Sequence, residues 1–152
     1  MSDEALLAGL REQYTQALDL LDGVFGRFPA DRWSAGGPPY TGPGRASAHA
    51  LVCAEFYTCR ERAALDHFQP PIWEMTDEQV PDQDTQKAYL AQVRAKTAAW
   101  FDRIAPTGLA ATDDEGTTAL EQIVYALRHL QHHTGEVFAY QKVCGIEVRG
   151  WE

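Results

Sequence analysis

The feature that most constrains this chain is a helical spacing of apolar residues that recurs in four separate segments. Within each segment, apolar side chains return every three or four positions, which places them along one face of an α-helix. No stretch shows, over a useful length, the alternation of apolar and polar residues that a half-buried strand requires. The segments cover approximately residues 4–29, 45–66, 84–104 and 117–144. Four such helices predict an all-α four-helix bundle.

The stretches between these segments carry residues that interrupt regular structure. Residues 34–44 are rich in glycine and proline, so we expect a loop there. Residues 67–83 contain three prolines and turn polar and acidic, which predicts a long connection with one short helical turn. The pattern leaves open whether the helices that this connection joins are parallel or antiparallel.

The last segment has the clearest boundaries. Thr118 and Glu121 fit a capping box at its start, and Gly145 follows its end. On a helical wheel at about 100° per residue, with the apolar stripe centred on Leu127, His129 and His133 fall roughly 120° to 160° away. We therefore expect both histidines at the margin of the core, in a cleft between two helices that solvent reaches. The predicted stripe comprises Leu120, Ile123, Val124, Leu127, Leu130, Thr134, Phe138 and Gln141.

Length and charge limit the classes of protein to consider. The 152 residues predict a single domain, residues 1–152, and a net charge of -9 disfavours binding to nucleic acid. The chain has no run of eighteen apolar residues and no secretory signal at its start, so we expect a cytoplasmic protein without a membrane span. Three cysteines without a Cys-x-x-Cys pair suggest neither a disulfide framework nor a zinc knuckle.

Three histidines carry the strongest chemical signal in the sequence. His129 and His133 are four residues apart on a predicted helix, so both imidazoles can face one point, whereas His132 points away. Alone, such a pair is often a surface coincidence. His49 lies on an otherwise apolar face of another predicted helix, where a lone histidine is usually a core residue. Together the three supply the three-nitrogen set typical of an open catalytic metal site.

In its helices and histidines, the chain resembles the DinB-like (YfiT-like) metal-binding four-helix bundles. The resemblance covers the whole layout: helix, Trp-containing Pro/Gly loop, helix with an early histidine, long connection, third helix, and a last helix with His-x-x-x-His followed by x-Gly-Gln/Glu. His49 matches the first ligand of the family, and His129 and His133 match the second and third. The family commonly has Arg and Gln around this glycine, where the present chain has Thr134 and Glu136. That departure leaves the ligand set intact.

The resemblance implies a function that the spacing alone does not. Relatives include bacterial low-molecular-weight thiol S-transferases and a thiol-dependent maleylpyruvate isomerase. We therefore expect a metal-dependent enzyme acting on a small molecule, with thiol transfer ahead of hydrolysis. The rivals are a metal-dependent hydrolase, a bundle that binds a small molecule without turnover, and a non-catalytic metal-binding helical module. The family often pairs its bundles, which makes a homodimer an expectation.

The metal itself is less determined than its ligands. Three imidazoles accept divalent zinc, nickel, iron, cobalt or manganese, and zinc or nickel is our first expectation. A di-iron bundle is excluded because it needs two Glu-x-x-His motifs, and the sequence has none. Because the chain is acidic overall, we expect attraction of an anionic thiol to come from the metal. We expect residues 34–44 and 67–83 to shape the substrate pocket.

Four further residues are candidates for roles around the metal. Glu136 is a candidate partner for an imidazole N–H, although a solvated acid on the helix surface is the favoured interpretation. Tyr125 and Tyr140 are candidates to orient substrate, with simple packing as the alternative. Cys53, four residues after His49, is expected to be a buried small residue rather than a thiolate ligand.

Overall fold

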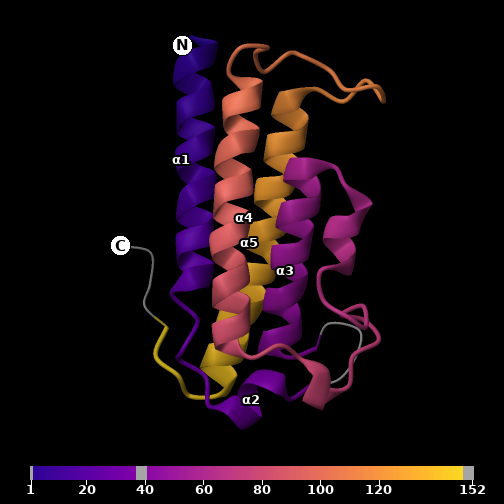
Figure 1. Cartoon of the computed structure of the whole chain (residues 1–152). Coiled ribbons are helices and arrows are strands. Elements are labelled where there is room, and N and C mark those ends of the chain that lie inside the picture. The colour runs from indigo at the N-terminus through magenta and orange to yellow at the C-terminus, as the bar shows by residue number, and fades with distance from the viewer. Residues whose placement is uncertain (1, 37–40, 149–152) are drawn as a thin grey trace.

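The computed structural model describes residues 2–36 and 41–148 as an all-α bundle, which confirms the predicted fold class (Figure 1). No strand occurs among these residues, and an isolated antiparallel bridge joins Thr112 and Thr118. In the same part of the chain, no helix is long and apolar enough to cross a membrane. The elements are α1 (Asp3–Asp22), α2 (Ala30–Ser34), α3 (Pro43–Cys59), η1 (Arg62–Asp66), η2 (Asp77–Gln79), α4 (Gln83–Ile104) and α5 (Ala119–Val143), where η denotes a 3₁₀ turn.

The long helices form a bundle in which α4 and α5 each contact both α1 and α3. Ion pairs show that α1 and α4 are antiparallel, because an earlier residue of α1 pairs with a later residue of α4, and the reverse. Arg11 pairs with Asp102 at 2.8 Å, and Arg94 pairs with Asp19 at 2.6 Å. The helix α5 likewise runs opposite to α3 (Figure 1).

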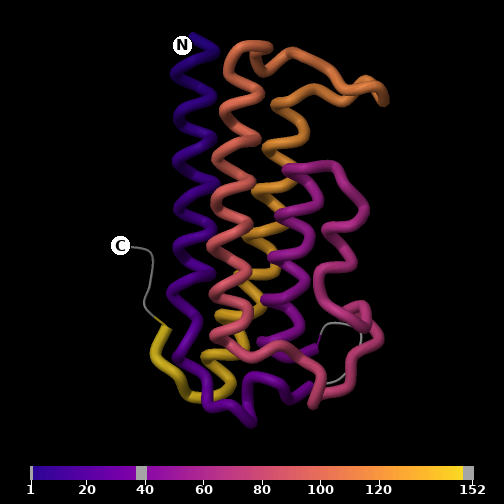
Figure 2. The backbone as a smooth tube through the Cα atoms, in the orientation of Figure 1, coloured from indigo at the N-terminus to yellow at the C-terminus, as the bar shows by residue number. Residues whose placement is uncertain are grey.

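The helices α3 and α4 are parallel, which answers the question that the sequence left open. At their starts, Gln86 Nε2 donates to the carbonyl oxygen of Gly44 at 2.9 Å. At their ends, Arg103 donates to the carbonyl oxygen of Thr58 at 3.0 Å. Because parallel neighbours cannot be joined by a tight turn, residues 60–82 must return along the length of α3, as Figure 2 shows. This crossover contains the short turn η2 that the sequence predicted.

Two predicted helix ends were wrong, and in both places the backbone explains the difference. The first helix ends at Asp22 rather than near residue 29, and the chain turns through Gly26, whose φ of 80° favours glycine. The second helix ends at Cys59 rather than at residue 66. Arg60 adopts a left-handed conformation with φ of 58°, which stops the helix and directs the chain into the crossover. The other two helices agree with prediction within about two residues, and the predicted capping box of Thr118 and Glu121 is present.

The buried face of α5 is rotated from the predicted stripe. Leu120 and Val124 are 36 % and 47 % exposed, and Leu127 is half-buried. The centre of the buried face lies about 70° around the helix from Leu127, at about 100° per residue. The sequence pattern placed the centre of the buried face wrongly because α5 carries more apolar residues than α1 and α3 can cover. The buried residues are Ala119, Ile123, Ala126, Leu130, His133, Thr134, Val137 and Gln141.

The crossover is fastened to the start of α3 by a buried arginine. The Arg45 side chain is 1 % exposed, and its guanidinium pairs with Asp77 at 2.7 Å. The same guanidinium donates to the carbonyl oxygen of Met75 at 2.8 Å. The contacts hold the return path against the bundle.

Gly44 allows a close backbone approach at this end of the bundle. A Cβ atom added there would lie 2.7 Å from the carbonyl oxygen of Trp33 and 2.7 Å from the Val80 side chain. We therefore expect Gly44→Ala to lower the free energy of unfolding by about 1–3 kcal/mol, because backbone would have to move. The matched control is Gly9→Ala in α1, where an added Cβ meets nothing within 4 Å. That change should raise stability by up to about 1 kcal/mol. Urea denaturation of the two variants tests the difference, and equal stabilities would contradict the close approach.

Candidate metal centre

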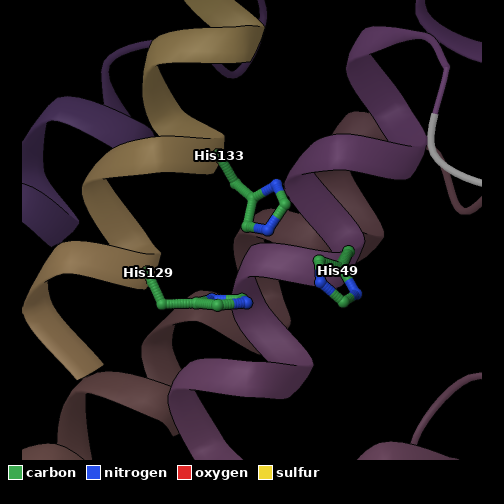
Figure 3. A group of neighbouring side chains, drawn as sticks. All are labelled: His49, His129 and His133. Carbon is green, nitrogen blue, oxygen red and sulfur yellow. The ribbon is translucent and has the colours of Figure 1, made fainter. Parts of the chain in front are cut away.

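The antiparallel pairing of α3 and α5 brings His49, His129 and His133 together (Figure 3). Each histidine offers one ring nitrogen to a set whose members all lie within 4.8 Å of one another. The ring centroid of His133 is 4.5 Å from that of His49 and 4.5 Å from that of His129, and the other two rings are 5.3 Å apart. The three residues predicted to meet therefore do so, and this group could hold a metal ion.

His133 is less exposed than the helical wheel predicted, whereas His129 lies at the margin of the core as expected. His133 is 7 % exposed and faces the core, because the buried face of α5 is rotated toward it. His129 and His49 are half-buried, so only these two lie at the margin of the core. The three histidines therefore span the boundary between the core and the surface of the bundle.

Burial keeps the ligand candidates in the form that binds a metal. Burial, with a smaller contribution from the neighbouring histidines, lowers the pKa of His49 to about 3 and that of His129 to about 4. Both imidazoles are therefore neutral at pH 7, and only a neutral imidazole can bind a metal. The set contains no carboxylate, so the charge of a divalent ion held there would not be neutralised by its ligands. The residues present fit such an ion.

Glu136 contacts the centre from the outside. His133 Nδ1 donates to Glu136 Oε2 at 2.6 Å, although the Glu136 side chain remains 40 % exposed. A carboxylate on one ring nitrogen fixes the tautomer and directs the other nitrogen to a metal. The hydrogen bond supports the partner role over that of a solvated acid.

We expect Glu136→Ala to reduce zinc affinity by about 10- to 100-fold, the usual effect of losing a partner of a ligand histidine. Glu136→Gln can still accept the hydrogen bond but lacks the charge, so its zinc affinity should lie between that of Glu136→Ala and that of the wild type. A competition titration against a coloured chelator measures the affinity. Glu4→Ala, at the exposed start of α1, makes the same charge change far from the centre and should have no effect. Unchanged affinity in Glu136→Ala would contradict the role.

His132 lies outside the three-histidine group, as predicted. Its side chain is 66 % exposed, and its Nε2 atom lies 3.4 Å from Glu136 Oε1. His132, His133 and Glu136 form a second, more exposed group with metal-ligating atoms. This group shares His133 with the first, so a variant of His132 can distinguish the two.

Cys53 has the properties of a buried core residue rather than a ligand. Its Sγ atom lies 3.6 Å from His49 Nε2 and does not belong to the converging set. Burial raises the pKa of the Cys53 thiol to about 12, so the sulfur is protonated at neutral pH. A protonated thiol is a poor metal ligand.

Tyrosines line one side of the centre, and the sequence singled out only one of them. The Tyr125 ring lies 6.4 Å from the His129 ring at an interplanar angle of 27°. Tyr57 packs edge-on against both, with ring centroids 5.2 Å from Tyr125 and 5.3 Å from His129. Tyr57 follows His49 by eight residues, about two helical turns, and this spacing was the signal that could have identified it. Tyr140 packs against the core, as in the alternative interpretation.

Two surface hollows of about 260 Å³ each flank Tyr125. One is lined by Tyr125, Arg128, His129 and His132, and therefore opens beside a candidate ligand. The other is lined by Tyr57, Arg60, Glu115, Thr117, Glu121, Gln122 and Tyr125. Neither is lined by residues of 34–44 or 67–83, the segments expected to shape the substrate pocket, so that expectation stays a prediction (Figure 2 shows the path of both segments). Residues 37–40 of the expected pocket lie outside the described part of the chain.

Comparison with known proteins bears on the fold alone. No family model matches the chain, and no curated protein is similar to it. A crystal structure of a conserved protein from Enterococcus faecalis is similar, with a TM-score of 0.65 over 90% of this chain and 95% of that one. The two sequences are 17% identical. The chain therefore shares its helical bundle, over nearly its whole length, with a solved protein.

Proposed function

We propose that this protein is a metal-dependent enzyme that transfers a low-molecular-weight thiol to an electrophilic small molecule. The observation that supports this proposal is the convergence of three histidines, without a carboxylate among them, beside a surface hollow. His49, His129 and His133 would hold a divalent ion, with zinc or nickel ahead of iron, cobalt and manganese. The layout also resembles the DinB-like bundles, in which thiol S-transferases occur.

The roles of the protein residues follow from their positions. A divalent ion held by His49, His129 and His133 would supply a Lewis acid that lowers the pKa of a thiol or of water. Glu136 holds the proton on His133 Nδ1 and so fixes the orientation of that ring. Tyr57 and Tyr125 pack against one side of the centre, where their rings contact His129 and each other. The hollow beside His129 gives a substrate access.

The transfer itself conserves atoms and charge. The sulfur of the thiol forms a bond to an electrophilic carbon, the leaving group departs with its bonding electrons, and the thiol proton goes to solvent. We rank thiol transfer ahead of hydrolysis because a thiolate is intrinsically a strong nucleophile toward carbon, whereas the lowered pKa would serve a thiol and water alike. The nearest carboxylate that the structure describes, Glu136, is occupied by two histidines.

The proposal is tested by following loss of free thiol in zinc- or nickel-loaded protein with an electrophile such as a haloalkane. We expect a rate above background with at least one of bacillithiol, mycothiol and glutathione, and loss of that rate in His129→Ala. Background rates with all three thiols would contradict the transferase. Release of acid from esters in the absence of thiol would favour the hydrolase instead.

A chelator separates an enzyme from a module in which the metal is structural. The core of the bundle is built from apolar side chains of all four long helices and extends well beyond the three histidines. We therefore expect a chelator to remove the ion and leave the helical circular dichroism signal unchanged. Unfolding on chelation would indicate a structural metal, as in small zinc domains.

A further inference from the structure

Arg128 projects into the hollow that opens beside His129, and it has no ion pair with any carboxylate that the structure describes. Its guanidinium carbon lies 5.2 Å from the centre of the Tyr125 ring, in a cation–π contact. Other arginines of this acidic chain are paired with aspartates, namely Arg11, Arg45, Arg60 and Arg94. The positive charge of Arg128 is thus left available beside the candidate metal centre.

The position of Arg128 changes the electrostatic argument made from the sequence. The net charge of -9 gives no general attraction for anions. Arg128 adjoins His129 in the sequence and lines the same hollow, so it supplies a local positive charge there. Its contact with the ring face of Tyr125 leaves the edge of the guanidinium fork open for hydrogen bonds.

The chemistry of the hollow selects a small carboxylate. A guanidinium fork matches the two oxygens of a carboxylate and can donate to both. The volume of about 260 Å³ is smaller than the roughly 300–1,000 Å³ of pockets that enclose drug-sized ligands. A short acidic molecule fits a hollow of this size, and His129 belongs both to its lining and to the candidate metal centre.

We propose that Arg128 and Tyr125 form a subsite for the carboxylate of a small substrate or thiol whose reactive end reaches the three histidines. The carboxylate would bind the Arg128 fork, and the Tyr125 face would hold that fork in place. The part of this inference that concerns the thiol end depends on the proposed function, whereas the carboxylate end depends only on the hollow.

The test compares two probes of equal size with cobalt-loaded protein. The probe 3-mercaptopropionate carries a thiol and a carboxylate, and 3-mercaptopropanamide carries the thiol with a neutral amide. We expect calorimetry to show binding of the acid about five- to tenfold tighter than the amide, the range for a charged hydrogen bond at a partly exposed site. The thiolate-to-cobalt absorption reports separately whether sulfur reaches the ion.

Variants assign the preference to Arg128. Arg128→Gln should reduce the affinity for the acid to that for the amide, and Arg128→Lys should keep part of the preference because it keeps the charge. Lys142→Gln removes the same charge from an exposed position of α5, about 21 Å along the helix axis, and should leave the preference intact. Arg128 is exposed, so none of these changes disturbs the core.

The outcomes separate the two proposals. If both probes bind through sulfur with equal affinity, the subsite is wrong and the thiol function stands. If only the acid binds, in an Arg128-dependent manner and without the cobalt absorption, the subsite stands and the thiol function is wrong. If neither probe binds, or if Lys142→Gln removes the preference as fully as Arg128→Gln does, the subsite is wrong.

Discussion

Replacing His129 by alanine is expected to lower the affinity of the protein for zinc by more than about 100-fold. This exceeds the 10- to 100-fold effect of losing a hydrogen-bond partner of a ligand, because a nitrogen of the converging set is itself removed. His129 is half-buried, so the variant should keep its helical content, which circular dichroism checks. The affinity is measured by competition with a coloured chelator, together with elemental analysis of protein purified without added metal.

Two more variants make this result specific. His132→Ala removes the neighbouring, exposed imidazole and should change zinc affinity by less than about threefold, since surface pairs contribute little. His49→Ala tests the ligand that comes from the other helix. If His49→Ala retains full metal content while His133→Ala loses it, α5 alone holds the ion through the second group, and the three-histidine centre is wrong.

Replacing Arg45 by alanine is expected to lower the free energy of unfolding by about 3 kcal/mol, near the lower end for breaking a buried ion pair. We take a value from the lower end because the Asp77 side chain is 46 % exposed, so water can solvate its carboxylate once Arg45 is removed. The change also removes a hydrogen bond from the carbonyl oxygen of Met75 and leaves a cavity where a 1 % exposed side chain stood. Urea denaturation measures the loss.

A matched pair on the surface provides the control. Arg11 and Asp102 join α1 to α4 at 2.8 Å, with side chains 44 % and 65 % exposed. Arg11→Ala should therefore cost less than about 1 kcal/mol. If Arg45→Ala and Arg11→Ala destabilise the protein equally, the crossover is not held by the buried arginine.

Variants of Arg45 and variants of the three histidines address different properties of the molecule. Arg45 lies at the start of α3 and contacts the crossover, whereas His49 faces α5 one turn later. We expect Arg45→Ala to change stability with little effect on zinc affinity of the folded protein. The metal affinity of the three-histidine group and the stability that Arg45 gives to the crossover can thus be changed separately, although both depend on residues of α3.

Local patterns in the sequence were sufficient for the helices and for the ligand candidates. Helical spacing and the capping box are properties of neighbouring residues, and α4 and α5 began and ended close to the predicted positions. The four-residue spacing of His129 and His133 likewise follows from helix geometry alone. The left-handed Arg60 could not be predicted, because such a conformation is uncommon for arginine and here belongs to the entry into the crossover.

By itself, the sequence determined that the chain forms four long helices and that two histidines share a helix face, because both follow from contacts within one or two turns. Only the tertiary structure decided that α3 and α4 are parallel, that His133 faces the core, and that the hollows flank Tyr125. These depend on which faces of distant helices pack together. The excess of apolar residues on α5 admits more than one rotation of that helix, and packing against α1 and α3 selects the one observed. That rotation brings His133 to His49 and leaves Arg128 beside the hollow.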